Sequence, residues 1–111
     1  MTTNNQEDIK AKALDLAGMV AYGDHAVVSR TLIDRKTGTL TLFAFDAGQG
    51  LSEHTAPFDA AVQIIEGEAL ITIGGNAVPA RTGELVIMPA GIPHSLKAQQ
   101  RFKMLLIMIR S

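Results

Sequence analysis

The sequence contains no cysteine and no tryptophan, and it has only one tyrosine. Without cysteine the chain has neither disulfides nor thiolate metal ligands, and the main reason to infer an oxidising compartment is gone. The formal net charge is −1 and no run of lysine or arginine covers a face, so neither a nucleic acid nor an anionic membrane is expected as a partner. The longest apolar run, residues 104–109, is far too short to span a bilayer, and the polar N-terminus lacks the apolar stretch of a signal peptide. A cytoplasmic protein is expected.

The composition that remains is that of an ordinary folded chain. Of the 111 residues 47% are hydrophobic and 19% charged, which suits one domain with a modest core. Apolar residues recur at helical spacing over residues 9–20, where a short helix is predicted, although Gly18 weakens its second half. We therefore divide the chain into a polar segment with a short helix, residues 1–25, and a β-barrel, residues 26–111.

From residue 26 onward the hydrophobic period is two, and glycine, proline or polar residues interrupt it at intervals of about eight to twelve residues. This pattern is typical of an all-β sandwich or barrel with eight or nine short strands. No segment of helical length lies between the strands, which disfavours parallel βαβ units. The strands are predicted at residues 26–33, 39–45, 61–66, 69–73, 77–81, 85–88, 94–98 and 102–110.

The last predicted strand is apolar on both faces between residues 104 and 109. A strand with one wet face would alternate polar and apolar residues, so both of its faces should be covered. Two coverings are open: the N-terminal segment of the same chain, or a second subunit. The second is slightly favoured, because a small barrel has little else to cover the strand, and it predicts a homodimer.

The segment from Gly83 to His94, GELVIMPAGIPH, is the most informative in the chain. Gly83 permits a sharp reversal before a buried strand, and Pro89 ends that strand because it has no N–H to donate. Gly91 allows a second turn, and Pro93 has a fixed φ. The result is a stiff approach that sets the direction of the histidine, as a binding or catalytic group requires.

At these positions the sequence resembles the cupin superfamily. The second cupin motif, G-x5-P-x-G-x2-H-x3-N, is matched at Gly83, Pro89, Gly91 and His94, with Ala98 in place of asparagine. The first motif, G-x5-H-x-H-x3,4-E-x6-G, is half present: Gly48, His54 and Gly67 match, while Ala56 and Ala60 replace the second histidine and the acidic residue. The resemblance covers residues 26–110 and implies a single-domain jelly-roll β-barrel, often dimeric, with a small molecule or metal at its centre.

In metal-dependent cupins the corresponding four residues hold Fe, Mn, Ni or Zn, so the resemblance makes His54 and His94 the metal ligands if any metal binds. Alanine at positions 56 and 60 has no donor atom. A zinc site is worth roughly 10–16 kcal/mol, so the loss of two ligands in four costs about 5–8 kcal/mol. His25 is a third histidine, but nothing in the sequence directs it to the barrel. A bound divalent metal is therefore disfavoured.

Two histidines at matching family positions should face each other across one cavity. We expect His54 and His94 to bind a small organic ligand there, such as a carboxylate, and to act as acid and base if the protein is an enzyme. The apolar part of the predicted site is Phe43, Phe45, Phe58, Met88 and Met104. Two alternatives remain open: a metal-dependent dioxygenase or isomerase-type cupin enzyme with a non-standard His54/His94 site, and a non-catalytic sensory or assembly module.

Overall fold

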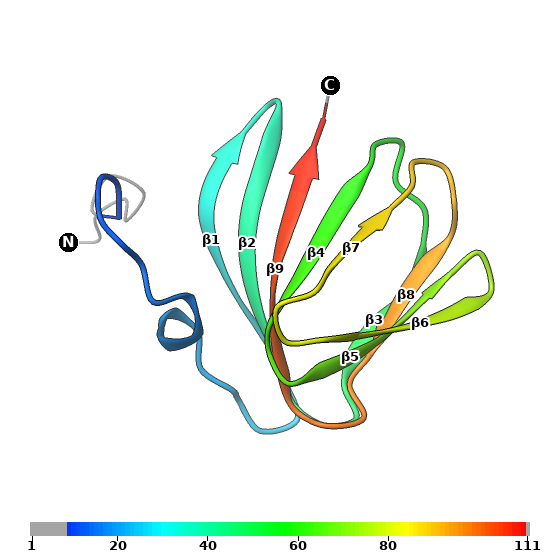
Figure 1. The fold of residues 1–111 in the computed structure, drawn as a ribbon, viewed down its shortest axis with the longest axis horizontal. Helices are drawn as coiled ribbons and strands as arrows, with labels where there is room; N and C mark the ends of the chain where they lie inside the picture. The colour runs from blue at the N-terminus through cyan, green and yellow to red at the C-terminus, as the bar shows by residue number, and fades with distance from the viewer. Residues whose placement is uncertain (1–8, 111) are drawn as a thin grey trace.

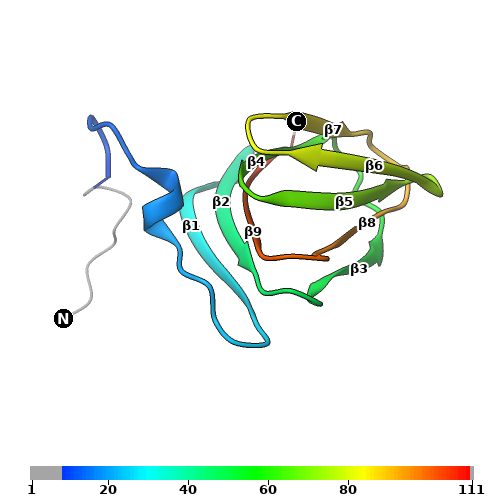
Figure 2. The same ribbon diagram turned by 60° about the horizontal axis from the view of Figure 1, so that its bottom comes forward.

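The computed structural model describes residues 9–110, which form two antiparallel sheets that face each other as a flattened barrel (Figures 1 and 2). The larger sheet has the order β1 (Val27–Arg35), β2 (Gly38–Phe45), β9 (Phe102–Ile109), β4 (Ala60–Glu66) and β7 (Leu85–Met88). The smaller sheet has the order β3 (Gly50–His54), β8 (His94–Lys97), β5 (Glu68–Ile73) and β6 (Asn76–Arg81). The predicted all-β fold is confirmed. The strand missing from the predicted segments is β3, where three polar residues in succession obscure the alternation.

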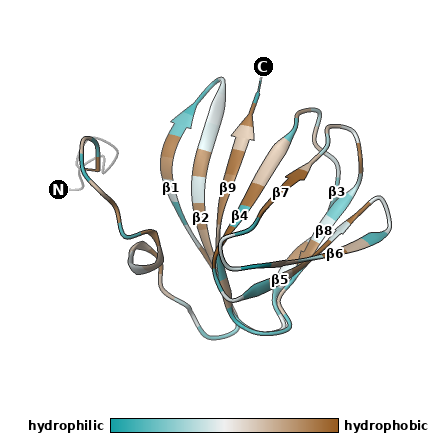
Figure 3. Cartoon of the chain, in the orientation of Figure 1, coloured by the Kyte–Doolittle hydropathy of each residue, from teal (hydrophilic) through white to brown (hydrophobic). Residues whose placement is uncertain are grey.

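The core lies between the two sheets, where alternate residues of each strand point inward. On β4, for example, Ala60, Val62 and Ile64 are buried while Gln63 between them is exposed. The rings of Phe45 and Phe102 stack at the closed end of the core, with centroids 4.5 Å apart. Hydrophobic residues follow one another along much of β9, β4 and β7 (Figure 3), although Leu85 and Ile87 on β7 are 53% and 62% exposed.

The N-terminal segment contains less helix than the periodicity predicts. In place of a helix over residues 9–20 the structure has one 3-10 turn, η1 (Leu16–Met19). Gly18 falls inside the turn, and a stretch this short does not form a stable α-helix without help from packing. Within residues 9–110 no helix is long and apolar enough to cross a membrane.

Of the N-terminal segment, the described residues 9–25 lie against the outer face of the larger sheet (Figures 1 and 2), and their apolar side chains cover part of β9. Leu105 is 8% exposed and shares a second apolar cluster with Val20. The Lys103 ammonium donates a hydrogen bond to the carbonyl oxygen of Ala17 at 2.6 Å. Residues 103–105 of β9 are thus covered by residues of the same chain. Ile109 beyond it is 56% exposed, and the subunit interface stays a prediction.

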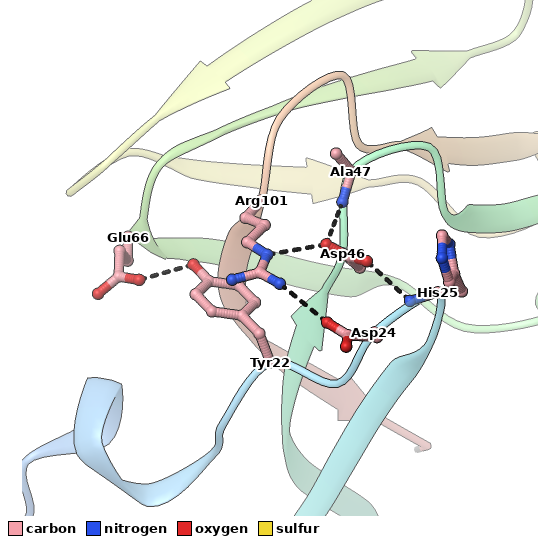
Figure 4. Close-up of polar contacts among 7 residues, drawn as sticks. All are labelled: Tyr22, Asp24, His25, Asp46, Ala47, Glu66 and Arg101. Carbon is pink, nitrogen blue, oxygen red and sulfur yellow. Dashed lines mark hydrogen bonds and ion pairs between the residues drawn. The ribbon is translucent and has the colours of Figure 1, made fainter.

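A polar cluster fixes the end of this segment to the barrel (Figure 4). The Tyr22 hydroxyl donates to Glu66 at 2.6 Å, and the guanidinium of Arg101 lies 5.1 Å from the centre of the Tyr22 ring. Arg101 Nε donates to Asp46 Oδ1 at 2.8 Å, and the backbone N–H of His25 donates to Asp46 Oδ2 at 2.7 Å. Burial, and then the hydrogen bond to Glu66, raise the pKa of Tyr22 well above its usual value. The cluster connects the turn before β1 with the ends of β2 and β9.

Asp46 should therefore make the stability of the protein depend on pH. The hydrogen bonds from Arg101 and then from the His25 N–H lower the pKa of Asp46 from 3.8 to about 2. A carboxyl group whose pKa is lower in the folded state stabilises the fold above pH 4, and this contribution is lost as the pH falls from about 4 to about 2. We expect Asp46→Asn to lower the free energy of unfolding at pH 7, and the difference from the wild type to shrink over that interval.

Urea denaturation at several pH values measures this difference. Asp34→Asn is the matched control, because it removes the same charge from an exposed position on β1. A difference between Asp46→Asn and the wild type that stayed constant down to pH 2 would contradict the assignment.

Candidate functional site

A β-bulge in β3 brings His54 opposite His94. Gly50 pairs with Lys97 and Leu51 with Leu96, but the next pair is His54 with His94, so β3 has one residue more than β8 over this interval. In a regular strand the residue opposite His94 would be Glu53, and His54 would point to the other face. Bulges change the direction of a side chain in this way. The extra residue thus replaces a carboxylate with an imidazole on the inner face of the barrel.

The two imidazole rings meet edge to face. Their Nε2 atoms are 3.1 Å apart, and the ring planes are at 72°. The Nδ1 atoms are held by the backbone, that of His54 2.8 Å from the Ser52 carbonyl oxygen and that of His94 3.2 Å from the Ile92 carbonyl oxygen. Since a carbonyl oxygen only accepts, each Nδ1 carries the hydrogen. In the neutral rings both Nε2 atoms therefore carry a lone pair and no hydrogen, and at 3.1 Å this favours an electron-poor atom close to both, a proton or a cation.

The turn between β7 and β8 presents His94 as the sequence predicts. The strand β7 ends at Met88, directly before Pro89, and Gly91 has a φ of +76°, which glycine adopts without strain. The N–H of Gly91 donates to the carbonyl oxygen of Ala56 at 2.8 Å, which joins this turn to the loop after β3. His94 is 3% exposed at the end of the turn. The two histidines are thus held by segments that are tied to each other.

The histidine pair lines a cavity of about 80 Å³. His54 lines this cavity and is also exposed, so the cavity reaches solvent beside it. The two imidazoles are the only strongly polar side chains in a lining that is otherwise aliphatic or thioether. The lining consists of Leu51, His54, Ala56, Ala60, Val62, Met88, His94, Leu96, Met104, Leu106 and Met108.

Of the seven predicted ligand-binding residues, the structure brings His54, His94, Met88 and Met104 together in this cavity. The three phenylalanines are not among its lining residues. Phe45 is fully buried against Phe102, Phe43 stacks on Phe45 with centroids 5.9 Å apart, and Phe58 is half-buried in the loop before β4.

The sequence-based prediction did not include the remaining lining residues, above all Met108. A signal for Met108 was present, because Met104, Leu106 and Met108 alternate on one strand and so point to the same face.

The set of four metal-binding residues found in metal-dependent cupins is incomplete in this cavity. Ala56 and Ala60 both line it, at the positions of the two missing ligands. Among residues 9–110 no three histidine, cysteine, aspartate or glutamate side chains come together to hold a metal. Asp59, the nearest acidic residue to Ala60 in sequence, accepts a hydrogen bond from the backbone N–H of Ala90, and His25 belongs to the cluster around Asp46. The residues present do not fit the four-ligand site for Fe, Mn, Ni or Zn.

Comparison with known proteins agrees with this architecture. The family model described as "Cupin domain" matches residues 41–109, more than half of the chain. A conserved protein of unknown function from Streptococcus pyogenes is similar to the chain with 40% identity and a TM-score of 0.86, over 91% of this chain and 89% of the other. A cupin superfamily protein from Desulfitobacterium hafniense has 27% identity and a TM-score of 0.86, over 92% and 94%. The chain belongs to the cupin superfamily.

More distant structures share the fold alone. A salicylate 1,2-dioxygenase from Pseudoaminobacter salicylatoxidans, in complex with gentisate, has a TM-score of 0.69 but 16% identity, over 75% of this chain and 25% of the enzyme. Among the curated proteins none matches. The family and its barrel are therefore shown by the comparisons, while the role of the cavity must be argued from its residues.

The hydrogen bonds at Nδ1 give a direct test of the geometry of the pair. We expect long-range ¹H–¹⁵N spectra of the rings in their neutral form to show the hydrogen of His54 and His94 on Nδ1, because each Nδ1 faces a carbonyl oxygen. His25 is the internal reference, since no such contact fixes its ring. A spectrum with the hydrogen on Nε2 of both His54 and His94 would contradict the arrangement.

Proposed function

We propose that this cupin binds a small organic acid in the barrel cavity, with the acidic group at His54 and His94. The observation that carries the proposal is that the two Nε2 atoms lie 3.1 Å apart in the lining of an otherwise apolar cavity. An apolar pocket with a few convergent polar groups is the usual composition of a small-molecule site. The proposal needs no divalent metal, in keeping with the alanines at positions 56 and 60.

The hydrogen bonding of the rings favours a ligand that brings its own proton. Both Nδ1–H groups are used by the Ser52 and Ile92 carbonyls, so a neutral pair offers lone pairs at Nε2 and no further donor. A carboxylic acid supplies one hydrogen to be shared between its oxygen and an imidazole nitrogen. Such a bond is charge-assisted once the proton moves to the ring, and it is about twice as strong as a neutral hydrogen bond.

The volume of the cavity limits the part of the ligand that enters. An apolar cavity of about 150 Å³ in another protein holds benzene, so a cavity half that size takes roughly three or four non-hydrogen atoms. A longer ligand has to extend past His54, where the cavity reaches solvent. Apart from the two histidines the lining contains no ionisable side chain, so the buried part of the ligand should be apolar.

Binding should require both the acid and the free cavity. We expect short straight-chain carboxylic acids to bind, and their methyl esters to bind far more weakly. Binding is measured by NMR chemical-shift changes, after metals have been removed with a chelator. His94→Ala should weaken binding by about 10- to 100-fold, the effect of losing one hydrogen bond to a charged group. Ala56→Leu should abolish binding by filling the cavity.

Two variants provide matched controls. His25→Ala removes an imidazole outside the cavity, and Thr55→Leu adds a leucine next to Ala56 at an exposed position that does not line it. Both should bind the acids as the wild type does. Equal binding of acids and esters, or unchanged binding by Ala56→Leu, would refute the proposal.

A further inference from the structure

Methionine and histidine gather in the barrel cavity. Three of the five methionines in the chain and two of its three histidines line this cavity. Met88 is 2% exposed, Met104 is fully buried and Met108 is half-buried. The five side chains provide two imidazole nitrogens and three thioether sulfurs, and no carboxylate or thiolate lies among them.

The histidine pair has the geometry of two neighbouring ligands of one cation. With bonds of about 2.0–2.1 Å to each nitrogen, Nε2 atoms that are 3.1 Å apart subtend about 100° at the cation. This angle is near that between adjacent ligands of a tetrahedral site and far from the 180° of a linear one. The Nδ1–H groups donate to backbone carbonyls, which is how histidines that bind metals are usually oriented. The pair therefore leaves room for further ligands on the cavity side.

The methionines stand on the strands that surround the missing acidic ligand. In the register of the larger sheet Ala60 pairs with Met88 on β7 and with Met108 on β9, so these two flank it on both sides. Met104 lies four residues from Met108 on β9 and points to the same inner face. At the position where the family places a hard carboxylate oxygen, this chain thus has a small residue between two thioethers.

The donor set decides which cation fits. Thioether sulfur is a soft, uncharged ligand that favours Cu(I), whereas Fe, Mn and Zn sites rely on carboxylates, more imidazoles or thiolates. We propose that the cavity is a site for Cu(I), held by His54, His94 and thioethers of Met88, Met104 and Met108. This goes beyond the proposed binding of an organic acid, and the two ligands compete for the same Nε2 lone pairs. The acid experiment is done without metal and the copper experiment without acid, so each can fail by itself.

The first experiment uses the wild-type protein with Cu(I) under anaerobic conditions. We expect one Cu(I) per chain, retained against a competing Cu(I) chelator, and an X-ray absorption spectrum with both nitrogen and sulfur neighbours. In protein labelled at the methionine ε-methyl groups, Cu(I) or its redox-stable analogue Ag(I) should shift the signals of Met88, Met104 and Met108. The signal of Met19, which lies outside the cavity, should stay in place.

The second experiment uses variants. The triple variant Met88→Leu, Met104→Leu, Met108→Leu keeps the volume of the core and removes the sulfurs. It should lower the affinity for Cu(I) by at least 100-fold, since the loss of even indirect partners of a metal site costs about 10- to 100-fold. His54→Ala should act in the same direction. Met19→Leu and His25→Ala are the matched controls and should bind Cu(I) as the wild type does.

Two results would overturn the proposal. One is a Cu(I) complex of the wild type without a sulfur neighbour. The other is a folded triple variant, shown by circular dichroism, that binds Cu(I) with unchanged affinity. Because the spectroscopy is done on the unaltered chain, the proposal is tested even if the triple variant fails to fold.

Discussion

The site depends on the register between β3 and β8. One extra residue in β3 determines that His54, and not Glu53, faces His94 inside the barrel. Without the bulge an imidazole and a carboxylate would form the pair, and they would satisfy each other as a hydrogen-bonded ion pair. With it, two like groups face each other with both Nδ1 atoms already bonded to backbone carbonyls. The pair is completed only by a third atom that accepts electrons from both nitrogens.

The rest of the barrel makes this requirement stronger. The cavity wall is apolar and His94 is almost fully buried, although His54 is exposed. In a low-dielectric setting an unsatisfied polar atom costs more than it does in water. Alanine at positions 56 and 60 removes the groups that would satisfy a hard metal, and it leaves the methionines of β7 and β9 as neighbours. Under the two proposals made above, the ligand of this cavity differs in kind from the hard divalent ion of a metal-site cupin: it is a proton-bearing acid or a soft cation.

The sequence was sufficient to predict the barrel because its turns are marked by residues with few conformations. Pro89 ends β7 and Gly91 has the positive φ of a tight turn, and both can be recognised without a structure. The direction of His54 could not be predicted in the same way. A bulge is a property of two paired strands, so the sequence of β3 alone does not reveal it. Phe45 lies outside the cavity lining for a similar reason: alternation identifies the inner face, but not which inward-facing residues border the cavity.

The N-terminal segment shows a second limit of periodic patterns. Apolar residues spaced as in a helix also cover a sheet when the chain is extended with a single turn, because burial requires only that Leu16 and Val20 reach the larger sheet. Hydrogen bonds between the segment and the sheet are made in place of those within a helix: Lys103 donates to the Ala17 carbonyl oxygen, and the Tyr22 hydroxyl donates to Glu66. The first contact is made to β9 and the second to β4, and Lys103 lies on the strand whose inner face carries Met104 and Met108 in the cavity lining. The larger sheet is thus covered on its outer face by a segment whose described residues, 9–25, contribute no side chain to the cavity lining.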